Sequence, residues 1–205
     1  NVSNPGCYPQ GFILLVRPLI EAGLLDRGTP LRCNAVSGYS GGGRQMIEQF
    51  QAMDAATANA LAVQSYGLNQ DHKHLPEMAE FSGTFVAPIF VPTVANYDQG
   101  MLTQIPLFVS ELGGASPARV HAVLAERYAD EAFIHVADLG DRSMLQGNYL
   151  NPTGRNNSNE MDLFVFGDDE RILLCARYDN LGKGAAGAAV QNLNLMLGLE
   201  ETTGL

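Results

Sequence analysis

Short apolar segments alternate with longer amphipathic stretches along the 205-residue chain. Six of the short segments are rich in Val, Ile, Leu and Phe and have the length of strands: residues 31–36, 85–91, 101–109, 133–136, 161–166 and 172–178. No internal repeat and no low-complexity linker interrupts the alternation. The pattern predicts a single α+β domain with one substantial core.

The stretches between these segments predict helices and one long loop. Pro9 and Gly23 are typical of a helix start and a helix end, and Ser116 is a favourable helix cap. The polar residues 147–159 predict a loop. Helices are expected over residues 9–22, 45–58, 116–128 and 184–197.

The charge and cysteine content restrict the partners and the compartment. The formal net charge of −10 argues against general nucleic-acid binding, which requires a basic face. A few local Arg, Lys and His side chains can still bind a small anionic substrate. No apolar run reaches the roughly 18 residues of a membrane span, no positive leader is visible, and three cysteines do not suggest a disulfide framework. These features predict a protein of the reducing cytoplasm that does not bind membranes.

A cysteine lies in the turn before the first predicted helix. Cys7 follows Pro5 and Gly6, which favour a tight turn, and precedes Pro9, whose fixed φ suits a helix start. Backbone N–H groups at a helix N-terminus favour an anion, so the pKa of the thiol is expected to fall. A thiolate can attack an activated carbonyl, and the same N–H groups can bind the resulting oxyanion. The alternative is that Cys7 is a small apolar residue in a turn.

Two of the four histidines lie in a second polar turn, residues 72–77. A histidine close to Cys7 could remove the thiol proton and later donate a proton. Lys73, or the second histidine, could bind an anionic group of the substrate. A surface loop is one alternative. A zinc site is another, and it would need ligands beyond His72, His74 and a nearby carboxylate.

Two glycine-rich segments match nucleotide-binding motifs only in part. Residues 37–44 have the glycine spacing of a P-loop, but Arg44 and Gln45 replace the required Lys and Ser/Thr, so ATP chemistry is not expected. Backbone N–H groups and the Arg44 guanidinium could still bind a phosphate. Residues 182–187 match Gly-x-Gly-x-x-Gly, but only one helix follows, so no βαβ unit can form. We expect a closely packed helix start there, with Asn180 free to project from the turn.

Several segments together resemble the N-acetyl-gamma-glutamyl-phosphate reductase family. They occur in the family's order and span nearly the whole chain: NPGCYP at residues 4–9, SGYSGGGR at 37–44, HKHLPE at 72–77, DNLGKGAAG at 179–187 and QN at 191–192. Gln10 and Gly42 depart from the family's usual Thr and Ala. The resemblance implies a mixed sheet with helices over one face, as in the C-terminal domain of glyceraldehyde-3-phosphate and aspartate-semialdehyde dehydrogenases. It also implies an N-terminal Rossmann domain as a partner, which these residues do not include.

The resemblance implies an NADPH-dependent enzyme of arginine biosynthesis that reduces an acyl phosphate to an aldehyde through a cysteine thioester. It implies that Cys7 is the nucleophile. One of the two turn histidines is the acid/base, and His74 is favoured. His72, Arg44 and Glu77 are expected to bind the substrate.

The same resemblance implies which residues lie near the cofactor NADP(H): Ser37, Gly38, Asn180 and Lys183. No metal is expected, and a homodimer or homotetramer built through the sheet is implied. An acyl phosphate of aspartate or of a carrier-bound glutamate is the alternative substrate. A non-catalytic dimerisation domain is the alternative from another class of function.

Overall fold

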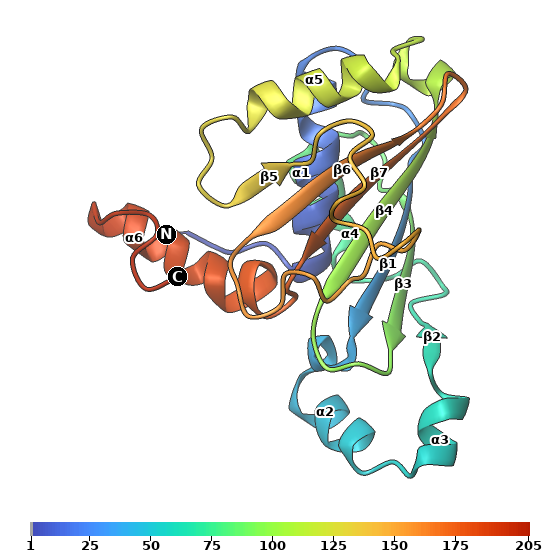
Figure 1. The fold of residues 1–205 in the computed structure, drawn as a ribbon, viewed down its shortest axis with the longest axis vertical. Helices are drawn as coiled ribbons and strands as arrows, with labels where there is room; N and C mark the ends of the chain where they lie inside the picture. Colours follow the sequence, from blue (N-terminus) through green and yellow to red (C-terminus); the bar gives the residue numbers. More distant parts are fainter. Residues whose placement is uncertain (1) are drawn as a thin grey trace.

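A computed structural model describes residues 2–205, which contain a seven-stranded mixed sheet (Figure 1). Its strands are β1 (Arg32–Gly38), β2 (Val63–Ser65), β3 (Ile89–Ala95), β4 (Met101–Phe108), β5 (Ile134–Val136), β6 (Met161–Gly167) and β7 (Arg171–Tyr178). They lie in the order β2-β3-β1-β4-β7-β6-β5. β1 pairs with β3 and β5 pairs with β6 in parallel, and the other neighbours are antiparallel. The predicted mixed sheet is confirmed.

Three helices cover one face of this sheet (Figure 1). They are α1 (Cys7–Glu21), α4 (Leu75–Ser82) and α5 (Pro117–Arg127). Helices α2 (Gly43–Gln51) and α3 (Ala55–Ala60) extend beyond the end of β1 and β3. Helix α6 (Gly187–Leu197) lies beside the described residues that precede α1 (Figure 1). Shorter helical turns are η1 (Tyr39–Gly42), η2 (Val109–Leu112) and the π-helical η3 (Gly182–Ala186).

The main core lies between α1 and the sheet. Phe12, Leu15 and Leu19 are fully buried and recur at the three- and four-residue spacing of one helix face. Leu174 and Tyr178 of β7 belong to the same core because alternate residues of a strand point to one face. Burying each large apolar side chain contributes about 1.5–3 kcal/mol. This packing holds the start of α1, and therefore Cys7, in a defined place over the sheet.

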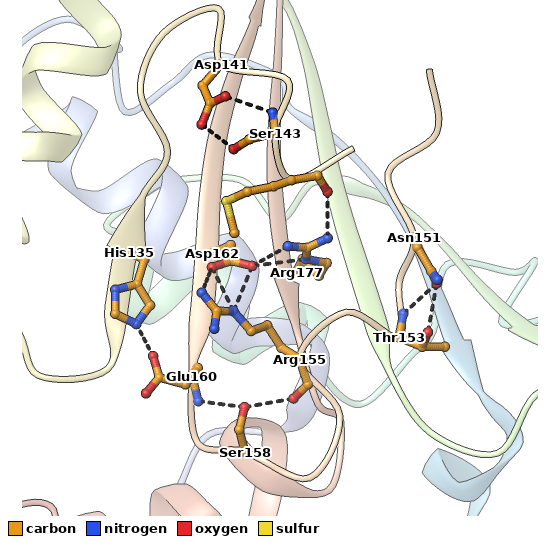
Figure 2. A network of polar contacts seen from close by, with 11 residues as sticks. His135, Asp141, Ser143, Asn151, Thr153, Arg155, Ser158, Glu160, Asp162 and Arg177 are labelled. Atoms are coloured by element: carbon orange, nitrogen blue, oxygen red, sulfur yellow. Dashed lines mark hydrogen bonds and ion pairs between the residues drawn. The ribbon is translucent and has the colours of Figure 1, made fainter. Parts of the chain in front are cut away.

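The opposite face carries a buried charge network (Figure 2). Asp162 of β6 is 0% exposed and accepts hydrogen bonds of 2.6–3.0 Å from both Arg155 and Arg177. Arg177 also donates to the carbonyl oxygen of Met144 at 3.2 Å. These bonds tie the long connection between β5 and β6 to the sheet.

Local differences from the predicted elements have identifiable causes. The helix expected over residues 45–58 is divided, because the Asp54 side chain accepts a backbone N–H and starts α3. The strand expected over 85–91 begins only at Ile89. Phe85 N–H instead donates to the carbonyl oxygen of Arg27 at 2.8 Å, and the Phe85 ring lies 4.5 Å from the Arg27 guanidinium carbon.

Two further differences concern short elements. β2 was not predicted, because a run of three residues is too short to show a strand pattern, and all three are exposed. The helix expected from residue 184 begins at Gly187, after the π-helical turn η3. None of the helices within residues 2–205 is long and apolar enough to cross a bilayer.

Candidate active site

Cys7 is the first residue of α1, and its backbone is held in place by the sheet. The residue before it, Gly6, is extended (φ −64°, ψ 160°) and has no side chain with which to cap the helix. The buried Tyr178 hydroxyl donates to the Cys7 carbonyl oxygen at 2.8 Å. The first N–H groups of α1 have no acceptor within the helix and are oriented towards its start, where an anion would bind.

His74 lies directly against the turn that precedes Cys7. The side chain is buried, and a β-carbon on Gly6 would lie 2.2 Å from its Nε2. Because that distance is far inside van der Waals contact, glycine at position 6 allows the imidazole to come this close. Nδ1 is buried without a hydrogen-bond partner in the described part of the chain. Nε2 is therefore the nitrogen beside the Cys7 turn.

The two turns line one open cavity of about 770 Å³. Its walls come from the amino-terminal turn, the glycine loop after β1, the histidine turn and the segment after β7. Lys73 also lines it. The predicted site residues that the structure brings together here are Cys7, His72, His74, Ser37 and Asn180.

Burial decides the protonation of the thiol and the imidazole. It raises the pKa of Cys7 above the ordinary value, although the Tyr8 N–H and the charge of Lys73 act in the opposite direction. The predicted fall in this pKa is therefore wrong for this chain, because desolvation outweighs the helix N-terminus. Burial first, and then His72 and Lys73, lower the pKa of His74 to about 4. At neutral pH the pair is a thiol beside a neutral imidazole.

Alkylation of Cys7 by iodoacetamide is expected to follow a pH curve with its midpoint above about 8.5, the value of an ordinary thiol. The thiolate reacts, and burial raises the pKa of Cys7. Lys73→Ala should move the midpoint further upward because the lysine charge lowers that pKa. Mass spectrometry at the Cys7 peptide measures the rate. Arg44→Ala is the matched control and should leave the curve unchanged, and a midpoint below about 8.5 would contradict the expectation.

Residues 7–180 match the family model described as semialdehyde dehydrogenase, dimerisation domain. The chain belongs to the semialdehyde dehydrogenase family. It is 47% identical to N-acetyl-gamma-glutamyl-phosphate reductase 2 of Nostoc sp., over 100% of this chain and 66% of that protein. It is 48% identical to the N-acetyl-gamma-glutamyl-phosphate reductase of Burkholderia cenocepacia, over 96% of this chain and 63% of that protein. The resemblance is confirmed, and the chain spans about two thirds of the length of these relatives.

Solved structures agree with the fold of this semialdehyde dehydrogenase domain. Aspartate semialdehyde dehydrogenase II from Vibrio cholerae matches with a TM-score of 0.65 at 16% identity, over 96% of this chain and 62% of that one. The aspartate semialdehyde dehydrogenase of Francisella tularensis matches with a TM-score of 0.66 at 12% identity, over 95% and 64%. At such low identity the likeness shows the fold, which is the one implied by the sequence resemblance.

Asn180 lines the cavity of this semialdehyde dehydrogenase domain, but its amide is bonded to the protein. It is 2% exposed; Oδ1 accepts the Gly100 N–H at 2.7 Å, and Nδ2 donates to Ser40 Oγ at 3.0 Å. The expectation that Asn180 projects freely is therefore wrong. Ser37 is also buried, and its hydroxyl lies 3.0 Å from the position of a β-carbon on Gly41. Both residues shape the wall of the cavity.

Other predicted residues lie outside the cavity lining. Arg44 is on α2, where its side chain is 90% exposed and pairs with Glu48 at 2.7 Å. Lys183 is buried and donates to Gln191 Oε1 at 2.6 Å, and burial lowers its pKa. Gly38 packs its Cα face against the backbone that precedes β4. The substrate and cofactor roles of these three residues stay predictions that the geometry of this chain does not support.

An aromatic cluster beside the histidines was missed by the sequence analysis. The Tyr66 hydroxyl donates to the Tyr8 hydroxyl at 3.2 Å, and the His72 ring lies within 6.1 Å of the rings of Tyr8, Tyr66 and Phe90. His72 Nδ1 accepts the N–H of His74 at 3.2 Å, so neutral His72 carries its proton on Nε2. Burial lowers the pKa of His72. The position of Tyr8 directly after Cys7 was the sequence feature that could have indicated an aromatic cluster at the site.

The zinc alternative gains no support from the histidine turn. Within residues 2–205, no group of three or more His, Cys, Asp or Glu side chains is arranged to hold a metal ion.

Proposed function

We propose that this chain is the catalytic part of an NADPH-dependent N-acetyl-gamma-glutamyl-phosphate reductase of arginine biosynthesis. The product would be N-acetyl-glutamate 5-semialdehyde. The observation that carries the proposal is the approach of His74 to the Cys7 turn inside one open cavity. Relatives that are 47% and 48% identical bear the name of this enzyme.

In the first half of the proposed reaction, the Cys7 sulfur attacks the acyl carbon of the acyl phosphate. His74 is neutral and accepts the thiol proton as the C–S bond forms. The N–H groups of Cys7 and Tyr8 at the start of α1 stabilise the oxyanion. The C–O bond to phosphate then breaks, His74 returns the proton to the leaving oxygen, and a thioester remains on Cys7.

In the second half, NADPH, when bound, would supply the hydride that reduces the thioester carbonyl. Exposed glycines at residues 41–43 line the cavity, and nothing lies within 4 Å of a β-carbon on Gly43, so this rim can admit the reactive end of the cofactor. Cys7 and Tyr8 again hold the oxyanion. Its collapse breaks the C–S bond and releases the aldehyde. The thiolate that remains regains a proton from water through His74.

Local groups can bind the anionic substrate in spite of the net charge of −10. Lys73 is exposed and lines the cavity, so its ammonium can pair with a carboxylate or phosphate. His72 is neutral at pH 7 and can donate one hydrogen bond from Nε2. We therefore propose Lys73 as the cationic contact and His72 as a neutral donor.

Two partners are part of this proposal. The exposed apolar side chains of α6, such as Leu193 and Met196, support a docking surface for a Rossmann domain, because large exposed apolar patches are typical of interaction sites. The description of the matching family as a dimerisation domain supports a homodimer or homotetramer. A cytoplasmic location stays a prediction.

Turnover by the chain joined to its Rossmann domain tests the proposed function. We expect NADPH oxidation with N-acetyl-glutamyl 5-phosphate at a kcat/KM about 10²-fold above that with aspartyl phosphate. The absorbance of NADPH measures the rate. Preference for aspartyl or carrier-bound glutamyl phosphate would identify one of those reductases instead. Absence of oxidation with all three substrates would favour a non-catalytic dimerisation domain.

A further inference from the structure

The Glu77 carboxylate is directed at the backbone beside Cys7 and is not part of the cavity lining. Its Oε2 accepts a hydrogen bond from the Gly6 N–H at 2.8 Å. The cavity is lined by Gly6, Cys7 and His74 but not by Glu77. The contact to the substrate expected for Glu77 from the sequence is therefore not supported by its position.

The bond to Gly6 replaces one that α1 cannot form by itself. In a capping box, an acidic side chain at the third helical position accepts the N–H of the N-cap residue. Pro9 occupies that position in α1 and has no acceptor on its side chain. Glu77 supplies the carboxylate from a different helix. The N–H groups of Cys7 and Tyr8 lie inside the helix start and are not used by this bond.

Glu77 is free for this role because its own helix start is satisfied in another way. It is the third residue of α4, from which a capping-box glutamate would reach back to the N-cap residue His74. The N–H of His74 instead donates to His72 Nδ1 at 3.2 Å. The carboxylate therefore bonds across to α1.

The Glu77 hydrogen bond and the His74 imidazole both contact Gly6. Glu77 holds the N–H of Gly6, while the His74 ring packs against the Cα of Gly6, and both come from the first turn of α4. The placement of the Cys7 sulfur relative to His74 Nε2 therefore depends on how firmly Gly6 is held.

We propose that Glu77 is a positioning residue that caps Gly6 from α4 and holds the Cys7 turn against His74, without contacting the substrate. Its effect on turnover rests on the proposed reductase function. The capping bond itself does not, because it exists in the chain alone.

Amide hydrogen exchange at Gly6, measured by NMR on the chain, tests the capping bond. Glu77→Met keeps the length of the side chain but removes the acceptor, and should speed exchange about tenfold or more. Glu77→Gln keeps an acceptor and should stay within about threefold of the unaltered chain. Glu80→Met, at an exposed position of the same helix, is the matched control. Unchanged Gly6 exchange in a folded Glu77→Met chain would overturn the proposal.

Kinetics of the enzyme joined to its Rossmann domain separate positioning from substrate binding. We expect Glu77→Met to lower kcat about 10- to 100-fold with KM within about threefold, and Glu77→Gln to restore most of kcat. A rise in KM with unchanged kcat would show substrate contact and overturn the proposal. If the unaltered enzyme reduces none of the acyl phosphates, the reductase function fails, whereas Gly6 exchange still decides the capping bond.

Discussion

Replacing Cys7 by serine is expected to lower kcat of the enzyme joined to its Rossmann domain by about 10⁴-fold or more. The hydroxyl is close in size to the thiol, but it is far less acidic and less nucleophilic. His74, whose pKa is about 4, is too weak a base to activate it. No thioester can then form. The rate of NADPH oxidation at saturating substrate measures the loss.

A second cysteine provides the control for this substitution. Cys175 is 1% exposed on β7, and its side chain belongs to the small apolar cluster on the sheet face away from α1. Cys175→Ala should leave kcat within about twofold below the temperature of unfolding, although stability falls by about 1 kcal/mol. If Cys7→Ser is folded and keeps more than about a hundredth of the activity, Cys7 is not the nucleophile.

Replacing Asp162 by alanine is expected to destabilise the fold by about 3–5 kcal/mol. Asp162 is 0% exposed and is the shared acceptor of Arg155 and Arg177. Its removal leaves the guanidinium of Arg177, which is 5% exposed, buried without its counter-ion. The loss is a large part of the roughly 5–15 kcal/mol by which domains are stable. Urea unfolding of the chain measures it.

An exposed carboxylate, Asp169, is the control for the effect on stability of losing one negative charge. Asp169 is exposed in the turn between β6 and β7, so Asp169→Ala should change the free energy of unfolding by no more than about 0.5 kcal/mol. Arg155, which is more exposed than Arg177, should matter less than Asp162 when replaced by alanine. A loss below about 1 kcal/mol in Asp162→Ala would show that water reaches the two arginines and replaces the carboxylate.

Local patterns account for most of the elements but not for their arrangement. β6 and β7 were predicted because their apolar residues form compact runs, and the start of α5 because Ser116 caps it through the Arg119 N–H. The order of the strands was not predictable from the residues alone, since pairing joins segments far apart in the chain. The start of β3 shows the same limit, because Phe85 is held outside the sheet by Arg27.

The features of the candidate site were likewise predictable from the sequence only in part. The sequence alone predicted the candidate site residues Cys7, at a helix start, and the paired histidines, and it determined the family. Helix termini and short motifs involve neighbouring residues and are visible in one segment. Only the tertiary structure decided that Glu77 bonds Gly6 rather than lining the cavity, and that Arg44 pairs with Glu48 outside the cavity lining.

The tertiary structure also decided the charge states. The raised pKa of Cys7 and the pKa of about 4 for His74 both follow first from burial. Burial is the summed effect of atoms from α1, the histidine turn and the segment after β7, which no single stretch of sequence contains. The N-terminus of α1 lowers the pKa of the thiol as the sequence indicates, but desolvation is the larger effect, and it exists only once the chain is folded.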